Sequence, residues 1–303
     1  MRFSNSMIVR KKFRLRVGAR TIELGERTLV MGVLNVTPDS FSDGGNFFRT
    51  ADAVKAALAM QRAGADILDI GAESTRPGST GISGEEELER LLPVLQGLRG
   101  RLRIPVSIDT QKARVAELAI GAGAEMLNDI SGLKSDPQIA EVAARSGVPL
   151  ILMHMRGTPR TMQKGPWAKD VMKDVSRGLR ESVDIARRAG VRKSQIILDP
   201  GIGFGKSFAQ NYELLAKLPA LARLGYPLMV GSSRKGFLGA TLARDGKPLP
   251  AEERIWGTAA TVTASILQGA HIVRVHDVEE MVQVARATDC LLHPKLRPRN
   301  AAG

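Results

Sequence analysis

The chain has 303 residues, of which 43% are hydrophobic, enough for one large α/β domain or two smaller ones. Its longest apolar runs fall short of the roughly eighteen residues of a membrane-spanning helix, and the N-terminus lacks the apolar core of a secretory signal. We therefore expect a soluble, cytoplasmic protein without a membrane partner.

The formal net charge of +13 would suit nucleic acid, anionic lipid or an anionic small molecule. Seven of the 44 basic residues lie in the first twenty positions, but only 4% of the residues are aromatic and able to stack bases. We therefore interpret residues 1–12 as a solvated basic tail and predict no specific nucleic-acid partner. An organelle transit peptide is an alternative, although residues 13–30 already alternate as a hairpin does.

Residues 13–30, with Gly18 at their middle, are the first predicted element, a β-hairpin. Eight apolar, β-branched-rich runs follow and predict strands around 29–34, 66–71, 104–108, 124–127, 148–153, 195–198, 227–230 and 271–275. Helical patterns lie between them, such as 51–63, which stops at Gly64, and 85–99, which follows the capping pair Ser83 and Glu86. Eight strand–helix units in roughly 250 residues favour a (β/α)8 TIM barrel over a doubly wound sheet, with the hairpin closing the barrel bottom.

A single domain over residues 13–293 is expected, followed by a C-terminal tail at 294–303, because no low-complexity linker divides the chain. Cys290 is the only cysteine, so a disulfide framework or a cysteine-based metal site is excluded. Its apolar helical context predicts a role in core packing.

Every predicted strand ends in polar residues, and active sites of such barrels lie where the strands end. One polar residue there is usually a helix cap, but eight groups at one rim indicate a site. The groups are Asn35; Glu73, Ser74 and Thr75; Asp109; Asn128 and Asp129; His154; Asp199; Ser232 and Ser233; and Arg274 and His276.

The loop after the first barrel strand is unusually long. It begins in "MGVLNVTPDSFSDGG" and runs from Val36 to about Arg49, although two to six residues would join a strand to a helix. A loop of this length predicts that its residues take part in the protein's function.

The segment "DPGIGFGKSF" at 199–208 resembles a phosphate loop but fails both glycine patterns. Pro200 stands where the Walker A motif needs glycine, and Lys206 where the dinucleotide motif needs its third glycine. Its glycines still permit close backbone approach around Phe204, which would either cover a flat ring or belong to the core.

The four histidines show no metal-binding spacing, which argues against zinc. Magnesium held by one protein oxygen and a substrate phosphate leaves little sequence signal, and Asn35 is the best candidate ligand. Arg76, Lys235 and Arg274 are the basic groups at the rim, whereas Asp109 and Asp199 follow apolar runs. The two acids would therefore be partly buried, paired either with a nitrogen-rich ligand or, in an internal salt bridge, with Lys235 or Arg274.

From about residue 29 to 280 the chain resembles the dihydropteroate synthase family of folate biosynthesis. The motifs that carry the resemblance are "LNVTPDSFSDGG", "GAESTRPG", "SIDT", "LNDISG", "MHMRGTP", "DPGIGFGK", "GSSRKGFLG" and "RVHD", in that order. Ala72 and Gln210 depart from the family pattern outside the expected contacts. The resemblance implies a transferase that condenses 6-hydroxymethyl-7,8-dihydropterin diphosphate with 4-aminobenzoate by an SN1-like substitution, releasing pyrophosphate and giving 7,8-dihydropteroate.

The resemblance also implies the roles of individual residues. Asp39, Lys235, Arg274 and His276 would be catalytic, with Asp39 stabilising a cationic pterin intermediate. The pterin would be bound by Asp109, Asn128, Met153, Asp199, Phe204, Gly231, Lys235 and Arg274. The second substrate, 4-aminobenzoate, would contact Phe41, Thr75, Arg76, Pro77, Phe204, Ser233 and Lys235. The diphosphate would be held by Asn35, Thr75, Arg274 and His276, with Mg²⁺ on Asn35.

Three further expectations follow from the resemblance: a homodimer formed through the last helices, inhibition by sulfonamides, and closure of the loops over the site to exclude water. A related pterin-binding methyltransferase, which moves a methyl group from methyltetrahydrofolate to a corrinoid protein, is the alternative activity. Such an enzyme needs neither a diphosphate site nor intact "TPDSFSDGG" and "GSSRKG" loops, and both loops are intact here.

Overall fold

The computed structural model describes residues 10–37, 46–75 and 78–293. A hairpin of β1 (Phe13–Val17) and β2 (Arg20–Leu24) comes first. The remaining strands are β3 (Leu29–Asn35), β4 (Ile67–Gly71), β5 (Val106–Asp109), β6 (Met126–Asp129), β7 (Leu150–Met153), β8 (Ile196–Asp199), β9 (Met229–Val230) and β10 (Ile272–Val275).

Helices separate the strands, as the predicted pattern requires. They are α1 (Asn46–Arg62), α2 (Gly84–Leu98), α3 (Ala113–Gly121), α4 (Gln138–Ser146), α5 (Val171–Arg188), α6 (Phe208–Ala216), α7 (Leu218–Ala222), α8 (Gly236–Thr241), α9 (Ile255–Leu267) and α10 (Val278–Leu292), with short 3-10 turns at Lys193–Gln195 and Ala251–Glu253. Ser83 caps α2 by accepting from the Glu86 N–H. The helix α1 begins at Asn46, earlier than the periodicity predicted.

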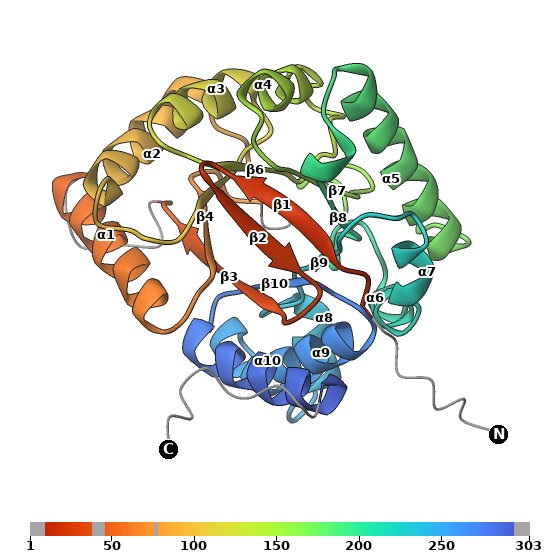
Figure 1. Cartoon of the computed structure of the whole chain (residues 1–303). Helices are drawn as coiled ribbons and strands as arrows, with labels where there is room; N and C mark the ends of the chain where they lie inside the picture. The colour runs from red at the N-terminus through yellow and green to blue at the C-terminus, as the bar shows by residue number, and fades with distance from the viewer. Residues whose placement is uncertain (1–9, 38–45, 76–77, 294–303) are drawn as a thin grey trace.

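The eight parallel strands form one sheet in the order β8-β7-β6-β5-β4-β3-β10-β9. The sheet closes on itself between β8 and β9, where Leu198 bridges to Leu228 and its N–H donates to the Pro227 carbonyl at 3.0 Å. Figure 1 shows the ring of helices around these strands. The predicted TIM barrel is confirmed.

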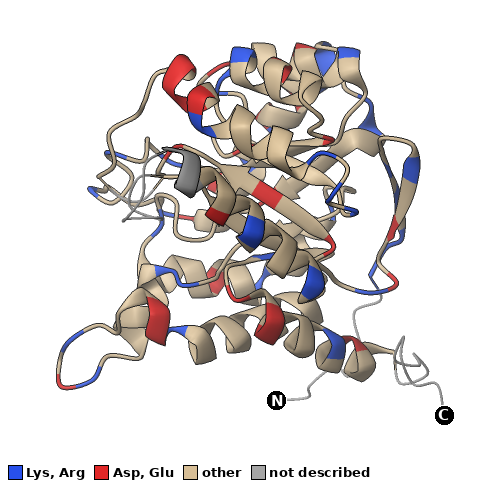
Figure 2. Ribbon diagram, turned by 90° about the vertical axis from the view of Figure 1, so that its left-hand side faces the viewer, with Lys and Arg blue, Asp and Glu red and all other residues tan. Residues whose placement is uncertain are grey.

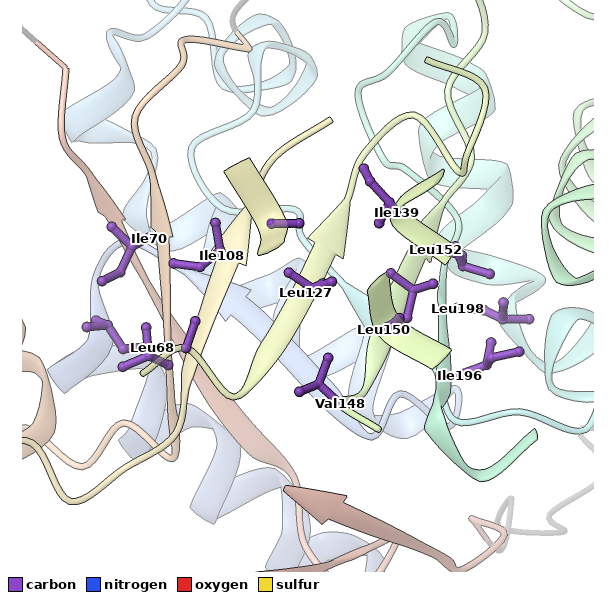
Figure 3. Packing of buried hydrophobic residues seen from close by; sticks show 14 of the residues in the cluster. Leu68, Ile70, Ile108, Leu127, Ile139, Val148, Leu150, Leu152, Ile196 and Leu198 are labelled. Atoms are coloured by element: carbon purple, nitrogen blue, oxygen red, sulfur yellow. The ribbon is translucent and has the colours of Figure 1, made fainter. Parts of the chain in front are cut away.

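Alternate residues of each strand face the helices or the barrel interior, since side chains in a strand point to opposite faces. The outward residues form the largest core cluster, in which Leu68, Ile108, Leu127, Leu150 and Leu198 pack against the helices (Figure 3). The parallel strands are thus buried on both faces, which explains their continuous apolar runs.

The hairpin closes the lower end of the barrel, as its position in the sequence predicted. It lies across the strands in Figure 1, and its Leu15, Val17 and Leu24 are almost completely buried. They pack on an inward-facing layer that most of the barrel strands supply: Leu29, Met31, Ile67, Met126, Ile151, Ile197, Met229 and Ile272. Because this apolar plug fills the bottom, the polar inward-facing residues gather at the other end.

Two predictions about individual residues are wrong. Arg10, placed in the solvated tail, is only 4% exposed and donates to Asp289 in α10 at 2.6 Å. Cys290 is exposed rather than packed in the core, because it lies on the outer face of α10.

Many basic residues of the described chain are paired with acids, including Lys12 with Glu26 and Arg14 with Glu23 on the hairpin. Figure 2 shows Lys and Arg interspersed with Asp and Glu along the helices on this side of the barrel. In the part of the chain that the structure describes, no helix is long and apolar enough to cross a membrane.

Candidate active site

Polar side chains fill the upper barrel interior, above the apolar plug. Asp109 on β5 is in register with Asn128 on β6, and Met153 on β7 with Asp199 on β8. All four occupy strand positions whose side chains face the barrel interior. Because they lie at the ends of neighbouring strands, they come together on one side of the barrel.

Arg274 on β10 is the centre of this layer. Its Nε donates to Asp69 Oδ2 at 2.7 Å, and its Nη2 donates to Asp109 Oδ2 at 2.8 Å. Asn128 Nδ2 donates to the same oxygen of Asp69 at 2.9 Å. Asp109 therefore forms an internal salt bridge with Arg274, which is one of the two kinds of pairing expected for it.

Asp69 is a site residue that the sequence analysis missed. It is fully buried in β4, where "ILDI" was interpreted only as an apolar strand. A carboxylate inside such a run is itself a signal, since a buried charge needs partners. Asp69 is two residues after Ile67 in the same strand, and Ile67 faces the barrel interior. Asp69 is therefore expected to face the interior as well, one layer higher.

Burial controls the titration of both predicted pterin acids. It raises the pKa of Asp109 to about 7, with the Arg274 guanidinium opposing the shift. Burial also raises the pKa of Asp199, whose Oδ1 accepts from the Gly201 N–H at 2.7 Å. Both acids are at most 9% exposed, as predicted, and would gain from a ligand that donates hydrogen bonds.

Three polar atoms of this layer have no hydrogen-bond partner: Asp69 Oδ1, Ser107 Oγ and Asn128 Oδ1. Ser107 is in register with Asp69 on the neighbouring strand. Native proteins rarely leave such buried atoms unpaired, so they indicate that the layer receives a polar ligand or ordered water.

Lys235 and Phe204 contact each other and form a wall beside this layer. Lys235 follows Arg234, which has a φ of +58° and is ion-paired with Asp277, so the chain turns and directs the lysine inward. Its Nζ lies 4.0 Å from the Phe204 ring centroid. Burial lowers its pKa to about 8, with Arg274 acting in the same direction and Asp199 and Asp109 opposing.

Phe204 and Met153 share a small apolar cluster with Ile130, Met155 and Met162. Phe204 thus belongs to the core, one of the two interpretations, and its ring also contacts the Lys235 ammonium, whereas the covering of a flat ligand ring stays a prediction. Gly231, just beyond β9, lies beside Arg274. A Cβ built on Gly231 would lie 3.7 Å from the Cβ of Arg274.

His276 and Ser233 are joined at the edge of the layer. Ser233 Oγ lies 3.0 Å from His276 Nδ1 and accepts from the His276 N–H at 3.2 Å. Burial, reinforced by Arg274, lowers the pKa of His276 to about 3, so its imidazole is neutral here. A contact of His276 with the diphosphate, which the resemblance implies, would therefore be made by a neutral imidazole unless the bound phosphate raised this pKa.

Asn35 is half-buried at the end of β3, in register with Gly71. Among the described residues no group of three or more His, Cys, Asp or Glu side chains could hold a metal ion. Asn35 therefore fits Mg²⁺ only if substrate phosphate and water supply the other oxygens. Thr75 is half-buried after β4, while Asp39, Phe41, Arg76 and Pro77 lie outside the described residues.

Other polar strand ends have structural roles. Asp129 accepts from the Ser131 and Leu133 N–H groups, Ser232 bonds to Thr261, and Glu73 pairs with Lys112. His154 contacts the buried Lys206. Asp129 and His154 each follow an inward-facing residue, so their parity directs them away from the barrel interior.

Comparison with known proteins agrees with this geometry. Residues 31–276 match the family described as pterin binding enzyme. The chain belongs to this family, among the dihydropteroate synthases. It is 52% identical to the dihydropteroate synthase of Synechocystis over 91% of this chain and 94% of that protein. Its activity is therefore that of a transferase of folate biosynthesis.

Two solved dihydropteroate synthases show the same fold. The enzyme of Xanthomonas albilineans with 4-aminobenzoic acid is 41% identical, with a TM-score of 0.86 over 93% of this chain and 99% of that one. The enzyme of Yersinia pestis in complex with a sulfonamide drug is 42% identical, with a TM-score of 0.85 over 92% and 99%.

Proposed function

We propose that the polar layer binds 6-hydroxymethyl-7,8-dihydropterin diphosphate and that 4-aminobenzoate replaces its diphosphate to give 7,8-dihydropteroate. The observation that carries this proposal is the set of buried acceptors around Arg274. Asp109, Asp199 and the unpaired Asn128 Oδ1 need donors, and a pterin edge offers an amino group and a ring N–H.

The pterin would lie between these acceptors and the Phe204–Lys235 wall. Asp109 and Asp199 would accept from the pterin edge, and Lys235 would donate to a ring acceptor. Met153 and Phe204 supply an apolar surface beside the flat ring. Gly231, which lacks a side chain, leaves room next to Arg274.

The leaving diphosphate would lie toward Arg274, His276, Asn35 and Thr75. Arg274 commits Nε and one N–H of Nη2 to the two acids, so Nη1 and the second N–H of Nη2 could donate to a phosphate. Asn35 would hold Mg²⁺ through its amide oxygen. When bound, the ion would neutralise negative charge that grows on the departing pyrophosphate.

The second substrate would enter at the edge formed by Thr75, Phe204 and Ser233, with Lys235 nearby. Phe41, Arg76 and Pro77, outside the described residues, are proposed to complete this subsite, and Asp39 to stabilise the cationic pterin. Sulfonamides would compete here with 4-aminobenzoate.

A dissociative, SN1-like substitution suits these residues, because the 4-aminobenzoate amine attacks a cation and needs no strong general base. The chain would contribute orientation, charge stabilisation and exclusion of water. We also infer a cytoplasmic homodimer that associates through the last helices. Trp256 in α9 is 79% exposed and Leu291 in α10 is 64% exposed, which would suit such an interface.

Incubation with labelled 4-aminobenzoate and the pterin diphosphate tests the activity, with the product separated by chromatography. We expect label in 7,8-dihydropteroate, and slower labelling when Asp109→Asn protein replaces the wild type at limiting pterin. Methyl transfer from methyltetrahydrofolate to a corrinoid protein, without dihydropteroate formation, would contradict the proposal.

A further inference from the structure

Lys206 is a buried lysine that the proposed reaction does not use. It is only 2% exposed and is among the largest fully buried side chains of the described residues. Lysines are almost never buried to this extent unless their charge is paired. The partners of its ammonium group therefore indicate what the residue does.

Four acceptors surround the ammonium. Lys206 Nζ donates to the carbonyls of His154 and Gly201 at 2.8 Å each and to that of Phe204 at 3.0 Å. It also lies 3.1 Å from His154 Nδ1. Burial and the Lys206 charge lower the pKa of His154, so its ring is neutral and Nδ1 can accept. Burial lowers the pKa of Lys206 itself to about 7, with Asp199 and Asp174 opposing the shift, and the loop 200–205 folds around this amino group.

Apart from Lys206, the loop is held by the Phe204 N–H, which donates to the Gly201 carbonyl at 3.1 Å, and by Asn211 and Gln163, which bond to the backbone of Gly203. Gly201, Gly203 and Gly205 all have positive φ, which a chain adopts readily only at glycine. A Cβ on Gly201 would lie 2.0 Å from the His154 carbonyl oxygen, so the loop packs directly on the chain that follows β7. Glycine-rich backbone of this kind has many alternatives once its carbonyls lose their donor.

The outer side of the same loop faces the proposed pterin site. Asp199 immediately precedes it, and its carboxylate accepts from the Gly201 N–H. Phe204 presents its carbonyl to Lys206 and its ring to Lys235. A Cβ on Gly203 would lie 3.0 Å from Lys235 Cδ, so the loop also limits where that side chain can lie.

We propose that Lys206 is a positioning residue for pterin binding, whose buried ammonium fixes loop 200–205 so that Asp199, Phe204 and Lys235 face the ligand. This inference rests on the proposed function. Lys206 itself does not touch the substrate, because its donors are directed into the loop.

Calorimetry with pterin-6-carboxylate, which lacks the diphosphate leaving group, tests the proposal on the full chain. Lys206→Met should weaken binding by about tenfold or more, since the loss of one well-placed contact is worth about 1.4 kcal/mol. Arg10→Met is the matched control, because Arg10 is a buried cation that bonds to Thr28, the Ala270 carbonyl and Asp289 at the hairpin end of the barrel. It should lower stability but change pterin affinity by less than about twofold.

A double-mutant cycle separates positioning from general destabilisation. If Lys206 acts through the loop, its effect on pterin affinity should be non-additive with that of Phe204→Leu. Additive effects, or wild-type affinity in folded Lys206→Met protein, would overturn the proposal.

If Lys206→Met does not fold, Lys206→Gln replaces it, because glutamine keeps two donors but is too short to reach all three carbonyls. Its affinity should fall about threefold or more, and an unchanged affinity would also overturn the proposal. Failure of the wild-type protein to bind the pterin would instead contradict the proposed function.

Discussion

Lys235 Nζ lies 4.0 Å from the centroid of the Phe204 ring, within the range of a cation–π contact. The ammonium is thereby held on the Phe204–Lys235 wall, within the electrostatic influence of Asp199 and Asp109, the two acids that oppose the fall in its pKa. A side chain so placed can donate to a ligand lying between the wall and the acids.

Lys235→Ala should lower kcat/KM for both substrates by at least about tenfold, because it removes this donor and leaves the acids less compensated. Lys235→Arg should restore little, since a planar guanidinium does not fit the place of a compact ammonium. Steady-state kinetics on variants with normal thermal unfolding provide the measurement. Lys217→Ala is the control, because Lys217 pairs with Glu213 on the surface. Wild-type values for Lys235→Ala would show that the lysine has no part in binding.

Asp109 should make pterin affinity depend on pH. Its pKa of about 7 means that the carboxyl is neutral at lower pH, where it loses one acceptor and presents a proton. Affinity should therefore fall as the pH decreases through about 7. In Asp109→Asn protein the affinity should be about ten- to hundredfold weaker, without this pH dependence. Calorimetry across this range checks both, and a parallel dependence in the variant would assign the titration to another group.

The same carboxyl links pH to stability. Because burial raises its pKa from 3.8 to about 7, the folded protein binds the proton more tightly than the unfolded chain does. This contribution to stability is present below the unfolded pKa and is lost as the pH rises through the folded one. The free energy of unfolding of wild type relative to Asp109→Asn should thus decrease between those values, as urea titrations at several pH values would measure.

Asp69 should matter for stability as well as for binding. Asp69→Leu leaves Arg274 Nε and Asn128 Nδ2 without their acceptor, and breaking a buried pair in this way typically costs about 3–5 kcal/mol. Asp69→Asn should cost less, because it keeps an acceptor oxygen. Urea unfolding measures both. If Asp69→Leu were as stable as the wild type, Arg274 would not depend on this carboxylate.

Asn35→Ala should raise the Mg²⁺ concentration needed for half-maximal activity, because Asn35 is the proposed protein ligand of the ion. Asn35→Asp is the matched control, since it retains an oxygen ligand and should need no more Mg²⁺ than the wild type. Activity is measured against Mg²⁺ concentration at fixed substrate. Full wild-type activity in excess chelator would refute the metal requirement itself.

The barrel and its closing hairpin could be predicted because strand and helix periodicities alternate without interruption. Asp109, Asn128 and Asp199 could be found because each ends an apolar run, and Arg274 because it interrupts one. Parity within the strand separates Asp109 and Asn128, which face the barrel interior, from Asp129, whose carboxylate caps its own turn.

Other features depend on three-dimensional contacts that local patterns do not contain. Carbonyl groups from two loops surround Lys206. The sequence "GFGK" does not contain this environment, and by itself it indicates only that the segment does not match a phosphate-binding motif. The exposure of Cys290 depends on how α10 packs against its neighbours. Arg10 is buried because Asp289, 279 residues away, accepts its hydrogen bond.

Release of pyrophosphate from the pterin diphosphate, with and without 4-aminobenzoate, tests the central claim most directly. With both substrates and Mg²⁺, the wild-type protein should release pyrophosphate and form 7,8-dihydropteroate in equal amounts, and Asp109→Asn and Lys235→Ala should be slower at limiting pterin. Folded wild-type protein that releases no pyrophosphate, or releases it without forming dihydropteroate when 4-aminobenzoate is present, would contradict the account.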